Sequence, residues 1–327
     1  MRYSQTEKME IIRIVEDSEL GITRTLKELQ IHKSTFYGWY KRYLEDGYKG
    51  LKSKYPSNRV VWNKIPQEIR GQVLDLALEQ PERSPRELAC LYTDNSGYFI
   101  SESSVYRILK QAGLITGPAM QLISASDRFK NPTVRVNQMW QTDFTYFKVM
   151  GWGWYYLSTI MDDYSRYIIT WELCTSMKAA DVSKCLHKAL DITGLTVEQA
   201  PKLLSDNGSC YISEDLKAYV QDRGIKHIRG APGHPQTQGK IERYHRSMKN
   251  VIKLDNYYSP QQLNEAIAAF VTYYNTQRYH EALNNITPED VFVGRQFEIL
   301  EKREKLKQKT INLRKKKYQI TKLKNSA

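Results

Sequence analysis

Long apolar runs and paired cysteines are both missing from this sequence. No apolar stretch approaches the roughly 20 residues that cross a bilayer as a helix. The chain opens on Met1-Arg2-Tyr3-Ser4 and not on an apolar leader, so we expect neither export nor membrane insertion. None of the four cysteines shows the C-x-x-C spacing of a zinc site, and they do not suggest a disulfide framework. They are Cys90, Cys174, Cys185 and Cys210. We therefore expect reduced thiols and a cytoplasmic protein.

Positive charge is present in excess. The 327 residues include 49 Lys and Arg against 36 Asp and Glu, which gives a net charge of +13. The length allows two or three domains, and the apolar content is ordinary for a folded globular protein. Such an excess favours a polyanionic partner, of which nucleic acid is the commonest. A basic protein without such a partner is the alternative.

Residues 1–50 are predicted to form a helix followed by a helix-turn-helix. Ser4 and Glu7 have the spacing of a capping box at the start of the first helix. The third helix would bury the aromatic series Phe36, Trp39, Tyr40 and Tyr43. Its exposed side would carry polar and basic residues suited to reading a major groove, namely Lys33, Ser34, Thr35, Tyr37 and Lys41. A helical bundle that binds protein is the alternative.

A second helix-turn-helix or winged-helix-like module is predicted over residues 59–115. Ser84-Pro85-Arg86-Glu87 combines an N-cap, a proline in the first turn and a capping-box Glu. Tyr98-Phe99-Ile100 is a candidate wing, and the helix after it would expose Tyr106 and Arg107 to DNA. A spacer or dimerisation unit is the alternative. Residues 116–136, with Gly117, Pro118 and Pro132, are predicted to be a linker.

Residues 137–295 are predicted to form an α/β domain. Aromatic and β-branched residues dominate three segments separated by turn residues, which predicts strands at 139–149, 155–161 and 166–173. Helical and strand patterns alternate after them, so the order β-β-β-α-β-α-β-α predicts a mixed sheet. Residues 296–327 are predicted to begin with a helix, from Arg295 to about Lys309, and to end in a basic tail. The expected role of this region is DNA contact or protomer assembly. Disorder of this region is the alternative.

Three acidic residues are distinguished by their surroundings. Asp143 interrupts an apolar strand, where an unpaired carboxylate is costly. Asp206 directly follows a strand, at a sharp Asn-Gly turn that can direct its side chain into a site, and Glu242 lies in a predicted helix. A divalent cation would make such positions tolerable, because Mg²⁺ prefers oxygen ligands.

Asp162 and Asp163 form a rival acidic pair in a hairpin turn. Aspartate is favoured there for turn chemistry, so we expect a structural role, with Asp163 capping the turn or pairing with Arg166. His234 precedes the Glu242 helix and has two open interpretations, substrate contact or loop stabilisation.

Five segments contain the motifs that identify the chain: Trp140-x-x-Asp143-x-Thr145, Asp163-x-Ser165-Arg166, Ser205-Asp206-Asn207-Gly208, His234-Pro235-Gln236-Thr237-Gln238-Gly239-Lys240-Ile241-Glu242-Arg243 and Tyr274-Asn275-x-x-Arg278-x-His280. Together they resemble the catalytic core of bacterial insertion-sequence transposases, members of the DDE superfamily that includes retroviral integrases. The resemblance covers about residues 135–295 and implies an RNase H-like fold with neighbouring first and fourth strands. It implies that Asp143, Asp206 and Glu242 are catalytic and hold two Mg²⁺ ions, with Mn²⁺ able to substitute.

The implied activity is that of a DNA transposase. It would nick transposon ends to free a 3′-OH and join this group to target DNA, without a covalent protein–DNA intermediate. The implied partners are double-stranded DNA, at the transposon ends and the target, and further copies of the chain, because two ends must be brought together in a dimer or larger assembly. A copy-out, paste-in route through a circular intermediate is also implied. The alternatives are an inactive DNA-binding regulator and a structure-specific nuclease.

The helix of Glu242 is rich in basic residues. We expect phosphate contacts from Lys240, Arg243, Arg246 and Lys249, and a solvated basic face is the alternative. The sequence departs from the family in two ways. Gln238-Gly239 stands where many relatives have Asn-Gly or Asn-Ala, and no His and Cys set has the ligand spacing of the zinc-binding domain of retroviral integrases.

Overall fold

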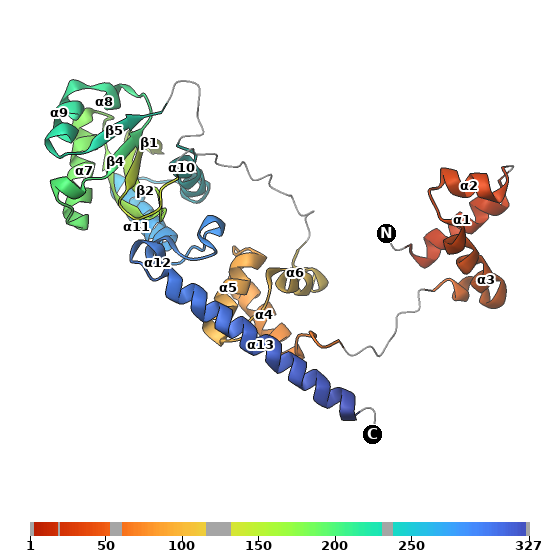
Figure 1. The fold of residues 1–327 in the computed structure, drawn as a ribbon. Coiled ribbons are helices and arrows are strands. Elements are labelled where there is room, and N and C mark those ends of the chain that lie inside the picture. Colours follow the sequence, from red (N-terminus) through yellow and green to blue (C-terminus); the bar gives the residue numbers. More distant parts are fainter. Residues whose placement is uncertain (1–2, 19, 53–60, 116–131, 231–237, 325–327) are drawn as a thin grey trace. The chain divides into compact units, whose positions relative to one another are not determined.

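The computed structural model describes residues 3–18, 20–52, 61–115, 132–230 and 238–324. The chain divides into two compact units, residues 1–64 and residues 65–324 (Figure 1). Most of the expected linker at residues 116–136 lies outside the described residues, and so does His234. Among the described residues, no helix is both long and apolar enough to span a bilayer.

The first unit is the predicted three-helix module, with α1 (Gln5–Glu16), α2 (Ile22–Glu28) and α3 (Lys33–Gly50). The capping box of α1 is present, since the Ser4 hydroxyl accepts from the Glu7 amide and the Glu7 carboxylate accepts from the Ser4 amide. Phe36 and Trp39 are buried in the module's core. The five residues expected to face DNA on α3 are all exposed: Lys33, Ser34, Thr35, Tyr37 and Lys41.

The second unit begins with α4 (Gln67–Glu79), α5 (Pro85–Ser96) and α6 (Glu102–Gln111), which surround a core of their own. The capping box between Ser84 and Glu87 is present. The expected wing is wrong, because residues 98–100 form no strand. The Phe99 amide instead donates to the Thr310 hydroxyl.

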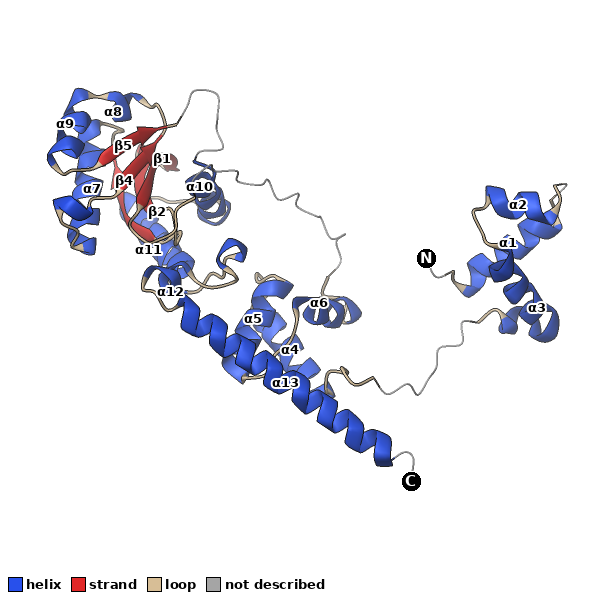
Figure 2. Ribbon diagram, viewed as in Figure 1, coloured by secondary structure: helices blue, strands red, loops and turns tan. Residues whose placement is uncertain are grey.

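A mixed five-stranded sheet follows, in the order β3-β2-β1-β4-β5 (Figure 2). Its strands are β1 (Met139–Val149), β2 (Gly153–Asp162), β3 (Ile168–Cys174), β4 (Lys202–Ser205) and β5 (Lys226–Arg229). The first three strands are antiparallel, whereas β4 pairs in parallel with both β1 and β5. The mixed sheet and the neighbouring first and fourth strands are thus as expected.

Helices cover both faces of this sheet. One face packs against α7 (Ala179–Thr193) and α9 (Glu214–Asp222), next to the short α8 (Ser209–Ile212). The other face packs against α10 (Gly239–Ile252) and α11 (Pro260–Thr276), through a core that includes Phe147, Ile241 and Phe270. This three-layer arrangement is the RNase H-like fold. The short α12 (Pro288–Phe292) leads to the C-terminal helix.

The C-terminal helix α13 runs from Gln296 to Lys324, so the predicted end near Lys309 is wrong. Contacts with α5 and the segment after it explain the difference. The Arg303 guanidinium bonds to the Asp94 carboxylate, and Arg314 bonds to the Tyr98 hydroxyl and the Phe99 carbonyl. Because these partners lie about 200 residues away in sequence, local periodicity does not reveal them.

Candidate active site

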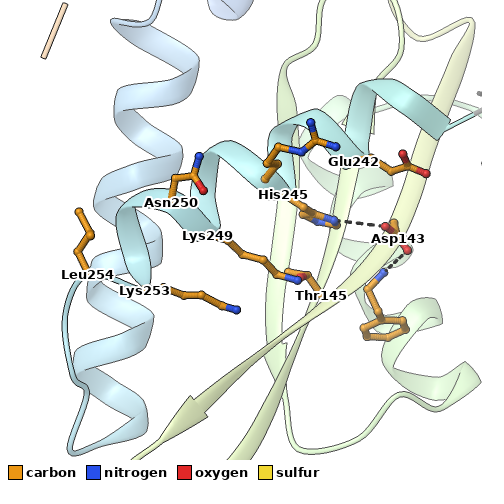
Figure 3. Close-up of a pocket in the computed structure, with 10 residues that line it drawn as sticks. Asp143, Thr145, Glu242, His245, Lys249, Asn250, Lys253 and Leu254 are labelled. Carbon is orange, nitrogen blue, oxygen red and sulfur yellow. Dashed lines mark hydrogen bonds and ion pairs between the residues drawn. The ribbon is translucent and has the colours of Figure 1, made fainter. Parts of the chain in front are cut away.

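Asp143 lies on β1 at the wall of a pocket of about 670 Å³ (Figure 3). Its side chain is 21% exposed. One carboxylate oxygen accepts the Phe144 amide hydrogen at 2.8 Å, and the other lies 3.3 Å from Nδ1 of His245. The carboxylate is therefore held at the pocket wall with part of its surface accessible.

Glu242 faces the same pocket from the first turn of α10 (Figure 3). The opposite side of this amphipathic helix is buried under the sheet through Ile241, Tyr244, Met248 and Ile252. Residues three, four and seven positions after Glu242 share its side of the helix, and all three line the pocket, namely His245, Arg246 and Lys249. A carboxylate pair and a basic rim thus face one cavity.

Asp206 immediately follows β4. In the parallel pairing of β1 and β4, Gln141 is opposite Leu204, and Asp143 and Asp206 each come two residues later. The Gly208 amide donates to the Asp206 carboxylate at 2.8 Å and fixes the turn. Burial raises the pKa of the Tyr211 phenol well above its usual value, and the charges of Asp143 and Asp206 both raise it further. The charges of the two carboxylates therefore act on the same buried phenol.

The predicted triad is only partly assembled. Asp143 and Glu242 line one pocket and Asp206 ends the neighbouring strand, but Asp206 is not in the pocket lining. No group of three His, Cys, Asp or Glu side chains within the described ranges is close enough to hold one metal ion. The donor set itself fits Mg²⁺, which takes carboxylate oxygens and retains waters. Asp206 and Glu242 are exposed, so their side chains have room to reorient.

Lys240, in the first turn of α10, and Asp163 form a buried ion pair. Their side chains are 11% and 2% exposed, and Lys240 Nζ lies 2.6 Å from Asp163 Oδ2. Lys240 is thus turned into the protein, which does not suit the DNA contact expected of it. Asp163 was expected to cap the turn or to pair with Arg166. The Arg166 guanidinium donates to the Asp163 backbone carbonyl, and Lys240 binds the Asp163 carboxylate.

Gln141 extends this pair into a network. Its side-chain amide donates to Asp163 at 2.6 Å and accepts the Ile241 amide hydrogen at 3.2 Å. Gln141 lies two residues before Asp143, and Lys240 lies two residues before Glu242. The network therefore links β1 to the first turn of α10, close to both carboxylates.

The sequence motifs gave no sign of the contact between His245 and Asp143. His245 is buried, and Nε2 lies 3.4 Å from the Thr159 hydroxyl on β2. Only its place one helical turn after Glu242 could have drawn attention to it. The structural interpretation of Asp162 is confirmed, because its carboxylate accepts from the Ser165 amide and hydroxyl inside the turn.

Comparisons with known proteins agree with this architecture. A family model described as "Integrase core domain" matches residues 133–235, and a second of the same description matches residues 223–288. The central domain is thus similar to integrase core domains over residues 133–288. Models described as "Homeodomain-like domain" match residues 2–52 and 35–109, upstream of the integrase core.

Homologues of the chain include transposases and retroviral polyproteins. The transposase for transposon Tn552 of Staphylococcus aureus is 25% identical over 85% of this chain and 62% of its own length. The transposase for insertion sequence element IS904 of Lactococcus lactis is 26% identical over 47% of this chain and 60% of its own length. The chain thus spans about three fifths of the length of these relatives. The magnesium complex of the HTLV-2 integrase catalytic core domain is 20% identical over 49% of this chain and 98% of its own, with a TM-score of 0.39.

Proposed function

We propose that this protein is a DNA transposase whose integrase core nicks transposon ends and joins the freed 3′-OH to target DNA. Asp143, Asp206 and Glu242 are its proposed catalytic residues. The observation that carries the proposal is the pocket that Asp143 and Glu242 share, with a basic rim beside it. Asp206 is included because it follows the strand paired in parallel with that of Asp143.

The proposed cofactors are two Mg²⁺ ions, with Mn²⁺ as a substitute, held by these three carboxylates. When bound, such ions activate the attacking oxygen and stabilise the leaving oxygen of an in-line displacement. Because the described residues hold no closed three-ligand cluster, we propose that Asp206 and Glu242 reorient when the ions and DNA bind. His245 restrains Asp143, which then has less freedom to lose on binding.

The basic residues of the pocket are proposed to bind DNA phosphates. Arg246 and Lys249 both line the cavity, and Arg243 is exposed on the same helix. Phosphate contacts of this kind orient a duplex without reading its sequence. Lys240 is not included, because its ammonium is buried against Asp163.

Recognition of the transposon ends is assigned to the helical modules. The exposed polar face of α3 is proposed to read a major groove, and Tyr106 and Arg107 on α6 are proposed to contact a second part of the site. The homeodomain-like matches support this assignment. We further propose domains at 1–50, 59–115, 137–295 and 296–327, at least a dimer on DNA, and a cytoplasmic location in association with the nucleoid.

One experiment separates this proposal from its alternatives. The protein is incubated with Mg²⁺ and linear DNA that contains its own coding sequence with flanking DNA on both sides. A transposase yields nicked ends with a free 3′-OH and joined products, whereas a regulator yields neither and a nuclease yields only nicks. Asp143→Asn should abolish both products, while Asp222→Asn, at an exposed position on α9, should retain them. Strand joining by Asp143→Asn would sink the proposal.

A further inference from the structure

Two aromatic side chains next to the candidate active site are exposed instead of being packed in a core. Tyr146 on β1 and Trp154 on β2 are 50% and 53% exposed. Their rings meet edge to face, with centroids 5.4 Å apart and an interplanar angle of 75°. Grouped exposed aromatics mark interaction surfaces more often than chance, because an unpartnered apolar patch is unfavourable in water.

The sheet topology explains this exposure. Only Met139, Trp140 and Gln141 of β1 pair with β4, so the rest of β1 extends past the end of that strand. Along this extension, buried Phe147 and Val149 pack with α10 and α11, while the alternating residues Tyr146 and Lys148 are exposed. Lys148 is opposite Trp154 in the register of β1 and β2.

Basic groups accompany both rings. Lys249 Nζ lies 4.7 Å from the centroid of the Tyr146 ring, within the range of a cation–π contact. Lys249 also lines the pocket that contains Asp143 and Glu242. The aromatic platform consists of Tyr146, Lys148, Trp154 and Lys249. The platform is thus continuous with the candidate active site through Lys249.

We propose that the aromatic platform stacks an unpaired DNA base beside the phosphate that reacts. This inference rests on the proposed function, since it takes the pocket to be a DNA site. Exposed aromatic rings next to a basic groove are the chemistry of single-strand binding, because every base offers a face for stacking and every nucleotide a phosphate for the lysines. A duplex end that frays at the pocket would supply such a base.

The charges of the platform favour DNA over a second copy of the chain. Lysine is depleted in the cores of protein interfaces, because burying an ammonium without a carboxylate partner costs hydration energy. Here Lys249 lies over one ring and Lys148 is opposite the other ring in the strand register. A copy of a chain with net charge +13 would bring further positive charge, whereas a phosphate compensates the lysines.

The test compares two DNA probes by fluorescence anisotropy, in EDTA so that no strand is cut. One probe is a short blunt duplex of mixed sequence, and the other is the same duplex with a single-stranded extension of a few nucleotides. We expect tighter binding to the extended probe. Trp154→Ala should weaken that binding about 5- to 100-fold and leave the blunt duplex unaffected. Trp154→Phe should retain most of the affinity, since it keeps an aromatic face and shows that the fold survives.

Phe297→Ala is the matched control, because Phe297 is 72% exposed but lines a different pocket, at the start of α13. It should change neither affinity. If Trp154→Ala lowers the affinity for both probes equally, or for neither, the proposal is overturned. A lower oligomeric state of DNA-free Trp154→Ala in sedimentation would overturn it too, in favour of an interface between copies. Since binding in EDTA does not require catalysis, this result is independent of strand joining by the Asp143 variant.

Discussion

Lys240 Nζ and Asp163 Oδ2 lie 2.6 Å apart in an almost fully buried ion pair. The pair joins the first turn of α10 to the turn after β2, and Gln141 joins both to β1. Two of the three network residues are each two positions from a candidate catalytic carboxylate. We infer that this network sets the position of Glu242 relative to Asp143.

The effects of replacing Lys240 and Asp163 on the free energy of unfolding should be strongly coupled. Lys240→Met leaves the Asp163 carboxylate buried without its cation, so we expect a loss of about 3–5 kcal/mol in the free energy of unfolding. Adding Asp163→Leu removes the unpaired buried carboxylate and should recover part of that loss. Urea unfolding of the two single variants and the double variant measures the coupling. Lys217→Met, which breaks an exposed pair with Glu214, should cost under about 1 kcal/mol. Additive effects of the two substitutions would show that the pair does not act as a unit.

His245 should act on activity through Asp143. Its Nδ1 lies 3.3 Å from the Asp143 carboxylate, so His245→Ala frees that carboxylate and should lower the rate of end nicking about 10- to 100-fold. The Mg²⁺ concentration for half-maximal rate should rise as well, which a loss of folded protein alone would not cause. His245→Asn, which keeps a hydrogen-bonding side chain, should recover part of both effects. An unchanged Mg²⁺ dependence in His245→Ala would exclude this positioning role.

Lys249 should contribute one phosphate contact. Lys249→Ala is expected to weaken binding to all DNA sequences alike and to flatten the dependence of log affinity on log salt by about one unit. The measurement is binding to a mixed-sequence duplex over a series of salt concentrations. Lys188→Ala, which removes an exposed lysine paired with Glu172 on the α7 side of the sheet, should leave the slope unchanged. The same slope in Lys249→Ala and the intact protein would rule this contact out.

His280 should make stability depend on pH. Burial, and then the charges of Arg278 and Arg166, lower its pKa from 6.5 to about 3. The unfolded imidazole takes up a proton as the pH falls below 6.5, while the folded one stays neutral, so stability is lost as the pH falls from 6.5 towards 3. The contribution is complete above 6.5, and we expect a loss on the order of 2 kcal/mol by about pH 5.

His280→Phe tests this pH dependence, because it removes the titrating group and can keep the edge-to-face contact with Tyr274. Its free energy of unfolding should vary less between about pH 5 and pH 7 than that of the intact protein. If the free energy of unfolding of His280→Phe varies with pH as much as that of the intact protein, other groups cause the pH dependence.

The C-terminal helix should depend on Arg303. Its guanidinium bonds to Asp94 on α5 and to the Asn285 carbonyl, so Arg303→Met removes both contacts. We expect faster amide hydrogen exchange in α13 beyond residue 303, with the exchange of the central sheet unchanged. Lys305→Met, at an exposed position two residues later, should exchange like the intact protein. If the amides of α13 are equally protected from exchange in both variants, Arg303 does not stabilise this helix.

Local signals determined much of this protein. The capping boxes at Ser4 and Ser84 join groups three residues apart, so the sequence alone could predict them. The aromatic and β-branched segments of β1 to β3, with the helical and strand patterns after them, predicted the mixed sheet, and the motifs around Asp143 indicated the similarity to integrase cores. In each case the interacting groups are near in sequence or the pattern repeats along one element.

Tertiary structure decided what depends on groups distant in sequence. Lys240 has the same local signature as a DNA-facing lysine, and only the position of the turn after β2 gives it Asp163 as a partner. Residues 310–324 lack an apolar pattern of their own and become helical where Arg303 and Arg314 find partners near α5. His245 meets Asp143 because the sheet and α10 pack together. Burial and charge pairing across the fold set these outcomes, and no short segment of sequence contains both members of such a contact.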